Sequence, residues 1–364
     1  MPKSKLISSG SYGCVFYPKI PCEKEKKHKK KHKKKSKRAT KLILIDDSLY
    51  DEYKINQSIQ KINNHEQWTA IWDEKCLSPK YKQLKKISQI DKCIDPKKQK
   101  LEKYEKLSPS KKFTLLQGYY GGEKAAKYMK INFTPLIYQS KKQFIKKFIE
   151  FFKMFEPLFL GLKEYYNHNI CHHDINVRNI LFKENKFIFI DYGLSFFTTK
   201  PNLIIQRMEK EFKSDRIYES YPYEYLYFPN YSKKEIQEEQ EEINLNVNRN
   251  QHTEIYLPIH KHLFNRNIDN LRSQYLQHKL INKQKYNLKK FTKSLDTYSL
   301  GMLPLILLLD QAGDHVIDIK TVISLLKSKQ LKSYIDLLKD MTTFHYNDRI
   351  NPNHAYQRYL QLIK

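Results

Sequence analysis

The densest group of potentially reactive side chains lies in two segments, HHDINVRN at residues 172–179 and FIFIDYG at residues 187–193. Asp174 and Asn179 are five residues apart on a predicted loop. A carboxylate at Asp174 can accept or orient a hydroxyl proton, and the amide of Asn179 can bind a metal ion. Two short apolar strands at 179–191 then end at Asp191, a second oxygen ligand suited to Mg²⁺. The spacing predicts a metal-dependent site that positions a hydroxyl group.

The two segments resemble the H-R-D-x-x-x-x-N and D-F-G motifs of the eukaryotic-type protein kinase family. Either motif alone is a weak signal, because His and Asp are common in surface loops. The strand–turn–strand between them is the structural context that the family requires. The resemblance implies Asp174 as a catalytic residue, Asn179 and Asp191 as metal ligands, and ATP and Mg²⁺ as cofactors.

The family also has a glycine-rich strand–turn–strand near the N-terminus, and ISSGSYGCV at residues 7–15 is similar to it. Glycines let the backbone fold close over phosphates, although most glycine pairs form ordinary hairpin turns. Ser8 stands where the first glycine usually lies. The resemblance implies that the ATP-binding residues are Ile7, Ser8, Gly10, Gly13 and Val15.

A lysine on the third strand is the next expected part, and RATK at residues 38–41 fits its V-A-x-K context. The resemblance implies Lys41 as the catalytic, phosphate-binding lysine, with Lys37 as the alternative. Its ammonium needs a carboxylate, because an unpaired charge is costly to desolvate. Glu52 on the following predicted helix is the expected partner and part of the ATP site, and Asp51 is the alternative.

Three downstream segments resemble supports of the kinase C-lobe. YPYE at residues 221–224 is similar to A-P-E, and DTYSLG at residues 296–301 is similar to D-x-W-S-x-G. The resemblance implies that Asp296 accepts backbone N–H groups of the catalytic loop. It also implies a buried ion pair between Arg349 and Glu224, which would join the activation segment to the lobe.

Several residues depart from the family pattern. His173 replaces the arginine that binds a phosphorylated activation loop, and a neutral His is a poor phosphate clamp. Asn176 replaces the lysine typical of Ser/Thr kinases, whereas Arg178 is reminiscent of tyrosine kinases. Asn56 lies where the family packs a hydrophobic residue. Ser/Thr transfer is the favoured hypothesis; a tyrosine or dual-specificity kinase and a pseudokinase scaffold remain alternatives.

A narrower resemblance lies in GSYGCVFYP, residues 10–18, followed by Pro21 and Cys22. It is similar to protein kinases of large nucleocytoplasmic DNA viruses, mimivirus-like ones among them. This resemblance favours Ser/Thr acceptors on protein substrates. The cysteines, interpreted as reduced thiols, predict an intracellular, cytoplasmic location. The viral resemblance implies the host cytoplasm or the virion, and the nucleus is also open.

The charge of the chain suggests a second kind of partner. The 364 residues carry a net charge of +28, and the run from Lys24 to Arg38 holds 11 basic residues and one acid. The run is typical of a solvated loop. It also suits an acidic partner, namely nucleic acid, an acidic protein or an anionic membrane surface, or a nuclear localisation role. Without zinc spacing, an RRM signature or basic heptads, charge is the main argument for nucleic-acid binding.

The resemblance implies an α+β, two-lobed protein-kinase-like fold, with a small β-rich N-lobe at 1–118 and a larger helical C-lobe at 119–364. The N-lobe carries a polybasic insertion at 23–38 and another insertion at about 63–110, and the C-lobe carries a polar insertion at about 230–290. A connector is expected at 117–123, one long helix at 144–167, and helices over the last 70 residues. No apolar run is long enough for a transmembrane segment. The five cysteines form no CxxC pair and are interpreted as reduced thiols.

Overall fold

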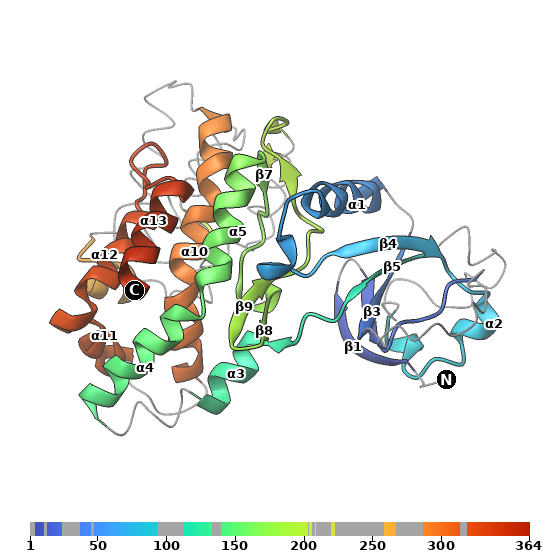
Figure 1. The fold of residues 1–364 in the computed structure, drawn as a ribbon, viewed down its shortest axis with the longest axis horizontal. Helices are drawn as coiled ribbons and strands as arrows, with labels where there is room; N and C mark the ends of the chain where they lie inside the picture. The colour runs from blue at the N-terminus through green and yellow to red at the C-terminus, as the bar shows by residue number, and fades with distance from the viewer. Residues whose placement is uncertain are drawn as a thin grey trace, which may run out of the picture. The chain divides into compact units, whose positions relative to one another are not determined.

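The chain has a mixed α+β fold in a computed structural model that describes residues 4–10, 13–23, 37–44, 47–93, 113–132, 140–202, 204–205, 208, 220–222, 258–266, 287–313 and 319–364. It divides into two compact units (Figure 1). Unit 1 comprises Met1–Gly122 and Ile190–Ser195, and unit 2 comprises Glu123–Phe189 and Phe196–Lys364. The short segment that carries Asp191 therefore belongs to unit 1, although the strand before it belongs to unit 2.

Unit 1 is built on an antiparallel sheet of five strands in the order β1-β2-β3-β5-β4. Its strands are β1 (Lys5–Gly10), β2 (Gly13–Tyr17), β3 (Arg38–Leu44), β4 (Trp72–Leu77) and β5 (Phe113–Tyr119). Its helices are α1 (Asp47–Gln60), η1 (His65–Gln67), α2 (Tyr81–Leu84) and η2 (Ile90–Cys93).

Side chains of β3 alternate between the two faces of this sheet, as a period of two requires. Leu42 packs with Phe16, Leu84 and Leu115 in one apolar cluster, whereas Ile43 packs with Leu116 in another. Lys41 is two residues before Ile43 and therefore lies on the same face of the sheet as Ile43. The strand thus carries its lysine on the face opposite the larger apolar cluster.

Strand β4 lies within the region that is predicted to be an insertion at about 63–110. Its sequence, WDEKCL, is mostly polar, which suits an edge strand better than a central one. Strand β5 also runs to Tyr119, so Gln117 belongs to the sheet and not to the predicted connector. Gly118 permits this packing, because a Cβ there would lie 2.1 Å from the carbonyl oxygen of Ile71.

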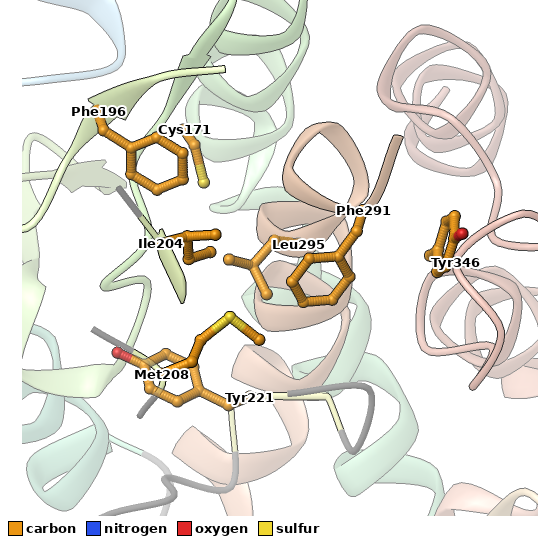
Figure 2. Close-up of a cluster of buried hydrophobic side chains, with 8 residues drawn as sticks. All are labelled: Cys171, Phe196, Ile204, Met208, Tyr221, Phe291, Leu295 and Tyr346. Carbon is orange, nitrogen blue, oxygen red and sulfur yellow. The ribbon is translucent and has the colours of Figure 1, made fainter. Parts of the chain in front are cut away.

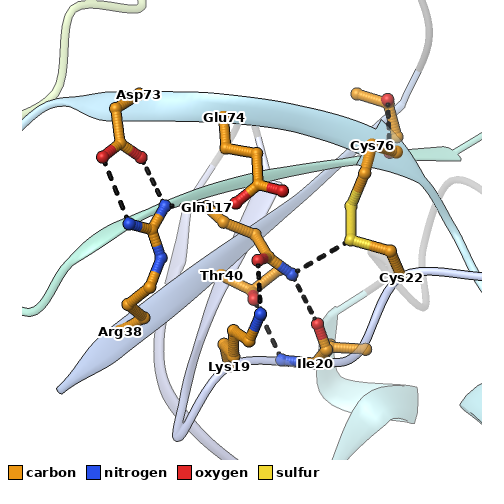
Figure 3. The surroundings of a disulfide bond; sticks show 10 residues. Lys19, Ile20, Cys22, Arg38, Thr40, Asp73, Glu74, Cys76 and Gln117 are labelled. Carbon is orange, nitrogen blue, oxygen red and sulfur yellow. Dashed lines mark hydrogen bonds and ion pairs between the residues drawn. A yellow bond between two sulfur atoms is a disulfide. The ribbon is translucent and has the colours of Figure 1, made fainter. Parts of the chain in front are cut away.

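The interpretation of the cysteines as reduced thiols is wrong for four of them. Cys14 is bonded to Cys93 across a sequence separation of 79 residues. Cys22 is bonded to Cys76 across a separation of 54 residues (Figure 3). Pairs this far apart are brought together only by the fold, so a search for short spacings misses them. Disulfides are rare in reducing compartments, and the cysteines therefore give no support to an intracellular location.

A buried polar contact lies beside the second disulfide. The side chain of Gln117 donates to the carbonyl of Ile20 at 2.7 Å and accepts from Lys19 at 3.2 Å. The amide of Ile20 donates to the hydroxyl of Thr40 at 2.9 Å (Figure 3). These bonds and the Cys22–Cys76 disulfide fix the chain after β2 against the sheet.

Unit 2 is mostly helical. Its helices are α3 (Ala125–Asn132), α4 (Lys141–Lys153), α5 (Glu156–Asn167), η6 (Val177–Asn179), η8 (Ile259–Leu263), α10 (Leu288–Gly313), α11 (Ile319–Leu326), η9 (Lys329–Leu331), α12 (Lys332–Met341) and α13 (Pro352–Ile363). Its short strands are β6 (Glu123–Lys124), β7 (Ile170–Cys171), β8 (Ile180–Lys183), β9 (Lys186–Phe189) and β10 (Phe196–Phe197). Strands β6, β8 and β9 form one small sheet, and β7 pairs with β10.

The predicted single helix at 144–167 is in fact two helices. Helix α4 ends at Lys153, and α5 begins at Glu156 with Pro157 in its first turn, where the missing N–H of proline costs nothing. Buried phenylalanines continue across the break, including Phe152, Phe155 and Phe159. An apolar pattern without interruption therefore concealed the boundary.

A buried cluster in unit 2 joins β7, β10 and α10 to residues between them in the chain. Figure 2 shows its members: Cys171, Phe196, Ile204, Met208, Tyr221, Phe291, Leu295 and Tyr346. Because Cys171 directly precedes the 172–179 loop, this packing fixes the start of that loop.

The described part of the predicted polar insertion at 230–290 also packs into unit 2. His260 is fully buried and is bonded to the hydroxyl of Tyr298 through Nε2 and to Arg266 through Nδ1. An arginine can only donate, so Nδ1 accepts and Nε2 carries the proton. Burial, together with the Arg266 charge, lowers the pKa of His260 well below its usual value.

Among the described residues, no helix has the length and apolar character needed to cross a membrane. Residues 24–36, most of the polybasic run, lie outside the described residues, as do 94–112 and most of 230–290.

Candidate functional site

Lys41 is the centre of a buried ionic contact in unit 1. Its Nζ lies 2.8 and 3.0 Å from the two carboxylate oxygens of Glu52 and 3.1 Å from Oδ1 of Asp191. The contact with Glu52 is the one expected from the sequence. The side chain of the alternative, Asp51, lies outside the described residues. Lys37, the alternative lysine, is exposed and lies just before β3.

The two carboxylates determine the charge state of Lys41. Burial by itself lowers the pKa of the ammonium, but the charges of Glu52 and Asp191 outweigh burial and raise the pKa above its ordinary value. The lysine is therefore a permanent cation near neutral pH. A fixed cation of this kind is suited to binding phosphate.

Helix α1 presents Glu52 to Lys41, and Asn56 holds this helix in place. Asn56 is fully buried; its Nδ2 donates to the carbonyl of Glu52 at 2.7 Å, and its Oδ1 accepts from the amide of Trp72 at 2.8 Å. The polar residue at a usually hydrophobic position is thus satisfied on both sides. It joins α1 to the start of β4.

Contacts of the next two residues in the chain, Tyr192 and Gly193, fix the turn at Asp191. Its backbone has φ 65°, and its Oδ1 also accepts from the amide of Gly193 at 3.3 Å. Tyr192 is buried and shares a hydrogen bond with the hydroxyl of Thr69. The tyrosine hydroxyl therefore ties the Asp191 turn to the segment before β4.

The glycine-rich segment forms the expected hairpin. Gly10 and Gly13 are paired at its end, and Val15 is opposite both Ser8 on β1 and Lys41 on β3. Gly13 has φ 140°, and a Cβ there would lie 2.5 Å from the carbonyl oxygen of Leu42, so only glycine fits. Ile7 lies at an irregularity in the β1–β2 register and is 43% exposed.

The second group of candidate residues lies in unit 2, in the 172–179 loop. Oδ2 of Asp174 accepts from Nδ2 of Asn179 at 2.6 Å, and Oδ1 accepts from Nδ2 of Asn176 at 2.6 Å. The Asn179 amide thereby presents its oxygen, the atom suited to a metal ion, away from Asp174. Asp174 itself is only partly buried, as a group that meets a substrate needs to be.

Asp296 on α10 supports this loop as the sequence predicts. Its two oxygens accept from the backbone amides of His172 at 2.6 Å and His173 at 2.9 Å. Burial raises the pKa of Asp296 to about 6, although the bonds from His172, His173 and Cys171 oppose this rise. Two otherwise orphaned N–H groups are thereby satisfied.

His173 is packed where no phosphate clamp could work. Its ring is 1% exposed and stacks on Tyr221 at 5.6 Å, with Phe196 at its edge at 5.7 Å. Its backbone has φ 66°. The His173 ring therefore belongs to an aromatic cluster with Tyr221 and Phe196.

Arg349 is buried and donates to the carbonyls of Thr343, Phe344 and Ser294. Its expected partner Glu224 lies outside the described residues.

The candidate residues thus form two groups, Lys41, Glu52 and Asp191 in unit 1 and Asp174 and Asn179 in unit 2. The motifs pointed to all five. The supporting roles of Asn56, Thr69 and Asn176 were missed, because a polar side chain at an unusual position carries no spacing signal of its own.

No protein-family model and no curated protein matches this sequence. The case for a function therefore depends on the residues themselves.

Proposed function

We propose that the chain is an ATP-dependent protein kinase that transfers the γ-phosphoryl group of ATP to Ser or Thr hydroxyls of protein substrates. The observation that carries the proposal is that the buried ammonium of Lys41 contacts both the buried carboxylate of Glu52 and the partly exposed carboxylate of Asp191. Burying these charges is costly, and a merely structural role is served as well by apolar residues.

Each residue has a definite task in this proposal. Lys41 and the hairpin backbone at Gly10 and Gly13 bind the phosphates, and Glu52 orients the lysine. Asn179 and Asp191 hold Mg²⁺, which neutralises the charge that develops on the phosphates. Asp174 orients the acceptor hydroxyl through its carboxylate. Catalysis then consists mainly of positioning and charge stabilisation.

The proposed fold is the two-lobed protein kinase fold, with unit 1 as the N-lobe and unit 2 as the C-lobe. The antiparallel sheet of unit 1 and the helices of unit 2 support it. We propose in addition that the run from Lys24 to Arg38 binds an acidic partner, because it concentrates 11 of the basic residues.

The test is incubation of wild type and Asp174→Ala with labelled ATP, Mg²⁺ and a mixture of proteins, followed by phosphoamino acid analysis. Asp336→Ala, on the exposed side of α12, is the matched control. We expect phosphoserine and phosphothreonine with wild type and the control, and a loss of at least about 100-fold with Asp174→Ala. Equal labelling by all three proteins would refute the catalytic assignment, and phosphotyrosine alone would refute the Ser/Thr acceptor.

A further inference from the structure

Both the oxygen and the nitrogen of the Asn176 side-chain amide make hydrogen bonds. Its Oδ1 accepts from the amide of Arg178 at 2.9 Å, which makes Asn176 the N-cap of η6. Its Nδ2 donates to Oδ1 of Asp174 at 2.6 Å and to the carbonyl of Asp174 at 3.2 Å. The residue is only 8% exposed, so these bonds are shielded from competition by water.

Through these bonds the Asp174 carboxylate is held on both of its oxygens. Asn179 binds Oδ2 at 2.6 Å while Asn176 binds Oδ1, and the amide of Asn179 donates to the carbonyl of Asn176 at 3.0 Å. The three residues form a closed ring of hydrogen bonds. The ring prevents rotation of the carboxylate.

We propose that Asn176 is a positioning residue, which fixes the Asp174 carboxylate in the orientation that receives the acceptor hydroxyl. This inference rests on the proposed function. Asn176 stands where a lysine is typical of Ser/Thr kinases, and it supplies a hydrogen-bond donor without a charge. The two amides together leave the carboxylate one orientation, and misplacement by about 1 Å can cost about 100-fold in rate.

A crossed pair of substitutions separates this role from the capping role. Asn176→Asp keeps an oxygen that caps η6 but places a carboxylate against Asp174. Asn176→Lys keeps a donor for Asp174 but cannot accept from Arg178. The matched control is Asn185→Asp, which makes the same change at an exposed residue of the β8–β9 turn. Asp174→Ala gives the rate without the carboxylate.

The readouts are kcat for phosphoryl transfer at saturating Mg²⁺–ATP, KM for ATP, and the thermal midpoint of the full chain. We expect Asn176→Asp to lower kcat by about 10-fold or more with KM for ATP within about 2-fold, because only the hydroxyl is misplaced. Asn176→Lys should stay within about 3-fold of wild type in kcat. The control should match wild type.

The outcomes distinguish this inference from the proposed function. If Asn176→Asp keeps the kcat of wild type, or if Asn176→Lys loses more than Asn176→Asp, the positioning role is wrong while the kinase assignment stands. If kcat falls only in step with the thermal midpoint of a variant, the loss is a structural effect, and the positioning role is also refuted. If wild type transfers no phosphate, or Asp174→Ala transfers as much, the proposed function fails and this inference fails with it.

Discussion

The side chains of Lys41 and Glu52 are 5% and 3% exposed, so the contact is a buried ion pair. Removing one partner of such a pair leaves a charge uncompensated, which typically costs about 3–5 kcal/mol. We therefore expect Glu52→Gln to lower the free energy of unfolding by about 3 kcal/mol. Asp191 offsets part of the loss, although its side chain is 39% exposed and hydrated. Urea denaturation measures the change.

The double variant Lys41→Met/Glu52→Leu is the control for this prediction. It replaces both charges by apolar groups of similar size, which is often neutral for stability. It should be more stable than Glu52→Gln and should bind no ATP in calorimetry. A Glu52→Gln variant as stable as wild type would show that the pair carries little energy.

Asp296 gives the stability of the chain a distinctive dependence on pH. Burial raises the pKa of its carboxyl from 3.8 to about 6, so the folded state binds the proton more tightly than the unfolded state. The stabilisation from this proton is fully present below pH 3.8 and is lost as the pH rises through about 6. Wild type should therefore gain stability relative to Asp296→Asn as the pH falls.

The gain should be about 1.4 kcal/mol between pH 7.5 and pH 5, because pH 5 lies about one unit below the folded-state pKa of about 6 and one pKa unit corresponds to about 1.4 kcal/mol. Urea denaturation of both proteins at the two pH values measures it. The Asn variant cannot titrate, and the effects of all other groups cancel in the difference. A difference that does not change with pH would contradict the raised pKa.

At the scale of elements, Asn56 joins α1 to β4 in unit 1. We expect Asn56→Leu to cost about 2 kcal/mol, because the partly buried amide of Trp72 loses its acceptor and the fully buried Asn56 loses both hydrogen bonds. The ATP affinity should fall as well, since α1 carries Glu52. Asn132→Leu is the matched control, because Asn132 also donates to the carbonyl four residues earlier but is exposed on α3. Equal losses in the two variants, measured by denaturation, would refute the role of Asn56.

The disulfides make a second prediction for the elements of unit 1. Thiol titration of the unfolded, unreduced chain should find one thiol, Cys171, out of the five cysteines. Each bond closes a long loop, so reduction should destabilise unit 1 by about 4 kcal/mol per disulfide on the chain-entropy account. A Cys22→Ala/Cys76→Ala variant should show only the loss that belongs to Cys14–Cys93 when a reductant is added. Five reactive thiols would contradict both disulfides.

The sequence predicted those elements whose pattern is local. The β1–β2 hairpin, β3, α1 and the β8–β9 turn follow from glycines, apolar spacing and turn residues near one another in the chain. The Lys41–Glu52 contact could be predicted, because a strand and the helix that follows it bring the two residues together. Asp296 followed from its motif, although it lies 124 residues from His172.

The elements that sequence analysis missed depend on distant partners. Strand β4 is polar, and only its pairing with β5 makes it a strand. The break between α4 and α5 is hidden by phenylalanines that remain buried on both sides. Cys14 and Cys93 meet only because η2 packs beside β1 and β2. No short-range pattern encodes these contacts.

At the scale of the whole molecule, the net charge of +28 predicts binding to polyanions. The polybasic run is attached to the edge strand β4 at both ends. On one side Cys22 is bonded to Cys76, and the amide of Glu23 donates to Leu77 at 3.1 Å. On the other side Arg38 is paired with Asp73. The described residues at the two ends of the run are thus both joined to β4.

We expect the affinity for heparin, used as the probe, to fall steeply with salt, because each neutralised anion releases a counterion. Replacing residues 24–36 by a neutral linker of equal length should reduce the slope of log K against log salt concentration by several units. The control replaces four exposed lysines of α4, Lys141, Lys142, Lys146 and Lys153, by glutamine. If the linker variant and the control reduce the slope equally, the charge acts as a diffuse property of the surface and the polybasic run is no docking segment.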